Sequence, residues 1–70
     1  MGFLLVEYPT VRAVYVDDMQ YGETRIPFQV SNGNHWIDLG PGNDYTPAFQ
    51  RVEISGEPSA APIRAFFMPR

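Results

Sequence analysis

The sequence predicts a small all-β domain, an antiparallel β-sandwich of about six strands. Seven prolines are spread along the 70 residues and leave one interval long enough for a helix, but β-branched and aromatic residues fill that interval. Short segments of strand-forming residues alternate with turn-forming residues along the rest of the chain. The length allows one domain over residues 1–70, either on its own or as a module beside a larger protein.

The first two predicted strands cover residues 3–8 and 11–17. Pro9 ends the first strand because proline lacks the backbone N–H that the interior of a sheet needs. In the second strand, period-two alternation places Val14 and Val16 on one face and the intervening residues on the other. Each strand therefore has two distinguishable faces.

Residues 17–22 are predicted to connect the second strand to a third, which covers residues 25–30. Pro27 places this third strand at an edge or a bulge. The Asn-Gly pair at residues 32–33 is the strongest short hairpin signal in the chain, because both residue types accept positive φ. It predicts a hairpin that leads into a fourth strand, residues 35–39, and fixes the register there.

The fourth predicted strand carries the clearest alternation. His35, Ile37 and Leu39 share the inward face, whereas Trp36 and Asp38 point outward. A histidine with two aliphatic neighbours on the same face is expected to pack against the core. The indole is expected on the outer surface.

The fifth and sixth predicted strands cover residues 48–54 and 63–68. Loops are predicted at residues 40–47 and 55–62. In the fifth strand Phe49 and Arg51 are predicted to point outward, opposite the core-facing aliphatic residues. The sixth strand is apolar on both faces, so either it is covered on two sides or its bare edge pairs with another chain.

Composition excludes several chemistries. The chain has no cysteine, which excludes disulfides, thiolate metal sites and cysteine nucleophiles. Its five cations are all arginines and its net charge is −3, so a duplex nucleic acid would be repelled rather than bound. The apolar run near the N-terminus is too short to span a membrane.

A set of short elements follows in order between Phe3 and Val52. They are Pro9, Val14-Tyr15-Val16-Asp17-Asp18, Gly22-Glu23-Thr24, Pro27, Gly33-Asn34-His35 and Tyr45. This order resembles that of a PEGA-type domain. The resemblance implies a compact β-sandwich that acts as a non-enzymatic accessory module, often beside larger domains in bacterial surface, envelope or signalling proteins. It carries over no catalytic residue.

The ionisable residues fit structural roles better than catalytic ones. His35 is the only histidine, so no second imidazole can share a metal or a proton relay with it, and we expect a packed side chain hydrogen-bonded near a turn. The acids at strand ends and loops are expected to accept backbone N–H bonds, with a weak cation site as the alternative. These acids are Asp17, Asp18, Asp38 and Asp44. Their spacing matches no calcium loop, and we expect neither a metal nor a cofactor.

The aromatic residues give the candidate binding site. Trp36, Phe49 and Arg51 are predicted to face outward, as residue types that supply large contact areas in interfaces. The alternative is that a loop or the last strand covers them. We predict a non-enzymatic structural or protein-interaction module that presents a sheet face or edge to a protein partner or to a second copy. The other hypothesis is a carbohydrate- or cell-wall-binding module that uses Trp36, Tyr45 and Phe49 as stacking platforms.

Overall fold

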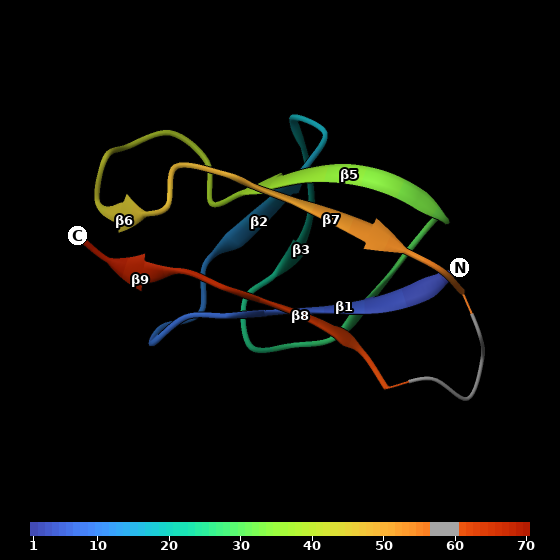
Figure 1. Ribbon diagram of the computed structural model, residues 1–70. Coiled ribbons are helices and arrows are strands. Elements are labelled where there is room, and N and C mark those ends of the chain that lie inside the picture. The colour runs from blue at the N-terminus through green and yellow to red at the C-terminus, as the bar shows by residue number, and fades with distance from the viewer. Residues whose placement is uncertain (57–60) are drawn as a thin grey trace.

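The computed structural model describes residues 1–56 and 61–70, which form nine strands and no helix (Figure 1). The strands are β1 (Gly2–Glu7), β2 (Ala13–Val16), β3 (Met19–Glu23), β4 (Phe28–Val30), β5 (Gly33–Asp38), β6 (Tyr45–Thr46), β7 (Gln50–Ile54), β8 (Ile63–Phe66) and β9 (Met68–Pro69). The predicted all-β fold class is confirmed. Residues 57–60, half of the loop expected at residues 55–62, lie outside the described residues.

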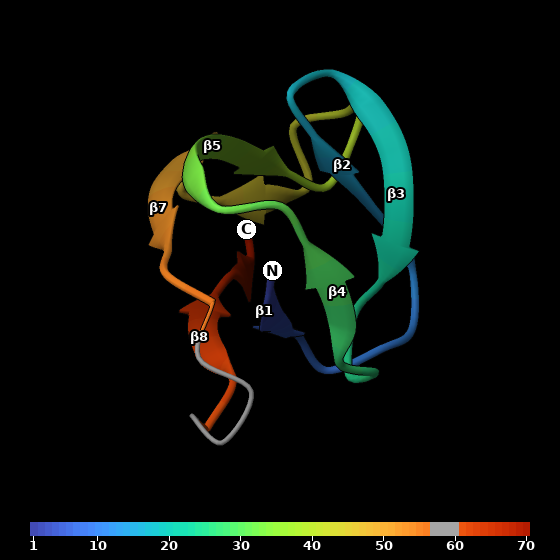
Figure 2. The ribbon, with the colours of Figure 1, turned by 90° about the vertical axis from the view of Figure 1, so that its right-hand side faces the viewer.

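Two sheets face each other across the core, as Figure 2 shows. One sheet has the strand order β3-β2-β5-β7 and is antiparallel throughout. The other has the order β4-β1-β8, in which β1 pairs antiparallel with β4 and parallel with β8. A short pair, β6-β9, forms a third unit. The parallel β1–β8 pair is possible because the chain passes through the opposite sheet before it returns.

The core lies between the two sheets and follows the alternation of the strands. Buried residues alternate along β1, β2 and β7, and in β5 Ile37 is buried between the exposed Trp36 and the half-buried Asp38. The buried hydrophobic residues are Leu4, Val6, Val14, Val16, Val30, Ile37, Leu39, Tyr45, Val52, Ile54, Ala65 and Phe67. Burial of a large aliphatic side chain contributes roughly 1.5–3 kcal/mol, so these residues supply the main stabilising term.

The hairpin predicted at Asn32-Gly33 is wrong. β4 ends at Val30 and pairs with β1, whereas β5 begins at Gly33 and pairs with β7 and β2. The chain therefore crosses from one sheet to the other at this point, with Gly33 at φ 120°. Asn-Gly determines the local turn of the backbone, but Val30 and Ile37 must both reach the core, which they do from opposite layers.

The predicted connection over residues 17–22 is much shorter in the structure. Asp17 and Asp18 alone join Val16 to Met19, with φ of 51° and 68°. Two consecutive positive φ values are typical of a type I′ hairpin turn. The following residues form the edge strand β3, which alternation did not reveal because its side chains are mostly exposed on both faces.

A buried hydroxyl closes one end of the four-stranded sheet. Thr24 is fully buried and follows β3 directly. Its hydroxyl donates to the carbonyl of Thr10 at 2.6 Å and accepts the backbone N–H of Arg12 at 2.9 Å. The backbone N–H of Thr24 also donates to the carbonyl of Arg12 at 2.9 Å. These bonds join the end of β3 to the segment that precedes β2.

Candidate binding face around Trp36

Trp36 belongs to an exposed aromatic pair on the outer face of the four-stranded sheet. Its side chain projects from β5 and Trp36 is 51% exposed. Phe49, which precedes β7, is also exposed, and the two ring centroids lie 5.3 Å apart with planes inclined at 73°. Arg51 is the register partner of Trp36 on β7 and is exposed as well. The outward placement predicted for these three residues is confirmed, and no described segment covers them.

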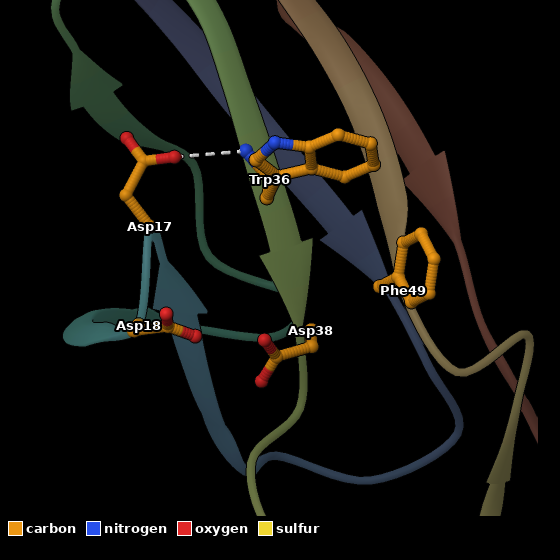
Figure 3. Close-up of a pocket in the computed structure, with 5 residues that line it drawn as sticks. All are labelled: Asp17, Asp18, Trp36, Asp38 and Phe49. Atoms are coloured by element: carbon orange, nitrogen blue, oxygen red, sulfur yellow. Dashed lines mark hydrogen bonds between the residues drawn. The ribbon is translucent and has the colours of Figure 1, made fainter.

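The turn residue Asp17 holds the backbone of Trp36 from the neighbouring strand. The N–H of Asp17 donates to the carbonyl of Trp36 at 2.9 Å, and the N–H of Trp36 donates to Oδ1 of Asp17 at 3.0 Å (Figure 3). The last regular pair between β2 and β5 is Val16 with Ile37. The Asp17 carboxylate therefore extends the ladder by one residue, in the place that a backbone carbonyl would otherwise take.

The second oxygen of Asp17 binds His35 on the other side of β5. Oδ2 of Asp17 lies 2.6 Å from Nδ1 of His35, and Nε2 of His35 lies 2.8 Å from the carbonyl oxygen of Ser31. Both ring nitrogens face acceptors, and only the imidazolium can donate from both. The hydrogen bond to Asp17 raises the pKa of His35, and the Ser31 carbonyl adds to this effect against the opposing effect of burial.

The same interaction fixes the charge of Asp17. The hydrogen bond from His35, followed by the one from the Trp36 backbone, lowers the pKa of the Asp17 carboxyl below its ordinary value. The His35 side chain is 12% exposed. The prediction of a packed, hydrogen-bonded histidine near a turn is confirmed, and its partner is an acid that we expected only to cap the turn.

Three carboxylates and the aromatic pair line one open hollow of about 430 Å³. Asp17 and Asp18 come from the hairpin turn, Asp38 ends β5, and Trp36 and Phe49 form the apolar side (Figure 3). Asp38 Oδ1 accepts the N–H of Gly40 at 2.8 Å, as expected of a loop cap. No hydrogen bond or ion pair within residues 1–56 and 61–70 engages the Asp18 carboxylate.

Alternation placed Asp38 on the outward face with Trp36, because the two residues are two positions apart. It did not bring Asp17 and Asp18 beside the indole. The position of Asp17 and Asp18 depends on the two-residue turn, which the sequence did not reveal. Arg51 does not line the hollow, since it lies on the β7 side of Trp36.

The prediction that Tyr45 is an exposed stacking platform is wrong. Tyr45 is only 7% exposed, and its ring lies edge-on to Phe67 with centroids 5.7 Å apart. Its hydroxyl donates to the carbonyl of Gly40 at 2.7 Å, and the guanidinium of Arg12 lies 5.1 Å from the ring centroid. Pairing of β6 with β9 carries this tyrosine into the core, away from Trp36.

The end of the chain forms a second exposed apolar surface. Ala65 and Phe67 are buried, whereas Phe66 and Met68 are exposed. β8 is an edge strand of its sheet, and the side chain of Gln50 on β7 donates to the carbonyl of Phe66. One face of this segment is thus bare rather than covered.

No group of three or more acidic or histidine side chains in the described part of the chain could hold a metal ion. Among the same residues there is no helix of the length and apolarity needed to cross a membrane. No family model matches the chain, and the searches of curated proteins and of solved structures found no match to it.

Proposed function

We propose that this domain is a non-enzymatic protein-interaction module, and that the outer face of the sheet around Trp36 is its binding surface. The observation that carries the proposal is the contrast at Trp36 between a fixed backbone and an exposed side chain. Asp17 bonds both backbone groups of this residue, while the indole remains half exposed. An aromatic side chain presented on a rigid strand contributes contact area at low entropic cost.

The geometry of the aromatic pair favours a protein partner over a polysaccharide. The planes of Trp36 and Phe49 are inclined at 73°, so the two rings cannot both stack on the flat side of one sugar. The third platform expected for a carbohydrate, Tyr45, is buried. An edge-to-face pair instead forms a corner that can receive a side chain from a peptide.

The arrangement of His35 supports a role without catalysis. Both ring nitrogens are engaged, with Asp17 on one side and the Ser31 carbonyl on the other, and His35 is not among the residues that line the hollow. A general base needs a free lone pair within reach of its substrate. The resemblance to PEGA-type accessory modules points the same way.

A selection of random linear peptides displayed on phage tests this proposal. The immobilised wild-type domain is compared with Trp36→Ala and with Phe66→Ala, which removes an exposed aromatic from the opposite sheet. We expect peptides that bind the wild type and Phe66→Ala but not Trp36→Ala, with all three proteins folded by circular dichroism. Selected peptides that bind Trp36→Ala as well as the wild type would overturn the proposal. A selection that yields no binding peptide would overturn it too.

Two parallel measurements separate the alternatives. A glycan array probed with the same three proteins would show carbohydrate recognition through Trp36 if that hypothesis were correct. Static light scattering across a concentration series reports self-association of the wild type and of Trp36→Ala. Dimers that disappear in Trp36→Ala would identify a second copy as the partner of this face.

A further inference from the structure

We propose that the segment bound by this face is basic, and that the hollow beside Trp36 receives a lysine or arginine side chain. This inference rests on the proposed function and names the chemistry of the partner. The argument is charge complementarity: every ionisable group that lines the hollow is a carboxylate, and the chain as a whole carries a net charge of −3.

The charge within the hollow is only partly compensated. When protonated, His35 is a local counter-ion for Asp17, so at most one of the three carboxylates has a counter-ion among the described residues. Asp38 accepts one backbone N–H, which satisfies one oxygen without neutralising the charge. In Figure 3 the carboxylates of Asp18 and Asp38 point toward one another across the hollow. A cation placed between them would relieve their mutual repulsion and gain two charge-assisted hydrogen bonds.

The aromatic side of the hollow matches the rest of a basic side chain. Lysine and arginine have an apolar stem and a charged head, and they bury the stem along apolar surface while the head seeks polar groups. The faces of Trp36 and Phe49 provide the apolar surface, and the hollow places them beside the acids. A guanidinium or ammonium near the indole also gains a cation–π contact, which is strongest for tryptophan.

Arg51 gives the site a direction. It lies opposite Trp36 in the register of β5 and β7, on the side of Trp36 away from Asp17. A second cation there would be repelled, so the basic side chain of the partner is directed to the β2 side. The orientation of the bound segment across β5 is thereby restricted.

The single tryptophan makes the test direct, because tryptophan fluorescence, excited selectively over that of the four tyrosines, reports only on Trp36. The probes are acetylated, amidated tetra-arginine and tetra-lysine, with tetra-glutamate as the comparison, each titrated into the full chain at low ionic strength. We expect a saturable change in Trp36 fluorescence with the two basic peptides and none with tetra-glutamate. Affinity should fall as salt rises, as is typical of exposed charge pairs.

Substitutions locate the cation. Asp18→Asn removes one charge and keeps a residue that tolerates positive φ. Asp38→Asn removes one charge and keeps an oxygen for the Gly40 N–H. Each variant should weaken tetra-arginine binding about threefold to fivefold. Glu23→Gln removes the same charge from β3 outside the hollow and should change affinity less than twofold. Arg51→Gln should strengthen binding. Thermal melts of each variant confirm that it is folded.

The outcomes are distinguishable. Equal losses in Glu23→Gln and Asp18→Asn would mean general attraction to an acidic protein and would overturn the site. If neither basic peptide binds, while the displayed peptides selected through Trp36 lack basic residues, the inference fails and the proposed function stands. If no displayed peptide depends on Trp36, both fail.

Discussion

Asp17 and Trp36 are joined by two backbone-directed hydrogen bonds of 2.9 and 3.0 Å, one from each amide to an oxygen of the other residue. The second bond uses the carboxylate of Asp17, whose other oxygen binds His35 at 2.6 Å. A single turn residue thus fixes the strand that presents the indole and also holds the imidazole behind it. The stability of the candidate binding face should therefore depend strongly on Asp17.

Replacement of Asp17 tests this dependence. Asp17→Ala removes the acceptors for Trp36 and His35, and we expect a loss of about 2–3 kcal/mol in the free energy of unfolding, including the cost of alanine at positive φ. Asp18→Ala is the matched control, since it shares the positive φ without these bonds, and should cost about 1 kcal/mol. Urea denaturation measures both. Equal losses would show that only backbone conformation matters.

Stability should depend on pH through the same pair. The folded pKa of His35 is raised, so its contribution is full below about pH 6.5, the ordinary value, and is lost as pH rises through the folded pKa. The folded pKa of Asp17 is lowered, so its contribution is present above about pH 3.9 and is lost as pH falls through the folded pKa. The pair stabilises most between these values.

The measurement is Tm as a function of pH for the wild type and His35→Gln. The difference between the two proteins should be largest near pH 5–6 and should shrink above neutrality. A titration of the His35 ring protons by NMR gives the folded pKa directly. A midpoint below the value of a free histidine would contradict the assignment of the imidazolium.

The buried hydroxyl of Thr24 predicts a contrast between two small substitutions. Thr24→Val keeps the shape but leaves the Thr10 carbonyl and the Arg12 N–H without that partner, and should cost about 2–3 kcal/mol. Thr24→Ser keeps the hydroxyl, loses one methyl group and should cost about 1 kcal/mol. Guanidinium denaturation ranks them. A valine variant as stable as the serine variant would mean that packing dominates here.

Gly22 allows the two sheets to approach each other. A Cβ at this position of β3 would lie 2.6 Å from a ring carbon of Phe28, which belongs to β4 of the other sheet. Gly22→Ala should therefore destabilise the domain by about 1–3 kcal/mol. In a double-mutant cycle, Phe28→Leu should reduce that cost by opening space for the methyl group. Independent, additive effects of the two substitutions would contradict the predicted contact.

Period-two alternation predicted the parts of the candidate binding face that lie within one strand. It placed Trp36 outward and Ile37 and Leu39 inward, and both placements are confirmed. Alternation could not reveal β3, because a strand exposed on both faces has no pattern to read. The acidic hollow went unrecognised for the same reason, since the β3 hairpin brings Asp17 and Asp18 beside β5.

Predictions that required knowledge of strand partners were less accurate. The Asn-Gly pair coincides with a bend at Asn32, but Gly33 already belongs to β5 and the strands that flank the pair lie in different sheets. Tyr45 reads as a loop aromatic, and only the pairing of β6 with β9 determines that it is buried. Such pairings are long-range, and local sequence carries little information about them.

The parallel contact between β1 and β8 joins residues 4–7 to residues 63–66. The central strand of the three-stranded sheet therefore keeps one edge without its partner until most of the chain has emerged from a ribosome. Closing a loop of this length is entropically costly, and domains dominated by such contacts fold in milliseconds to seconds. During synthesis Leu4 and Val6 remain incompletely covered until β8 is available, which makes this the step at which a chaperone would be most useful.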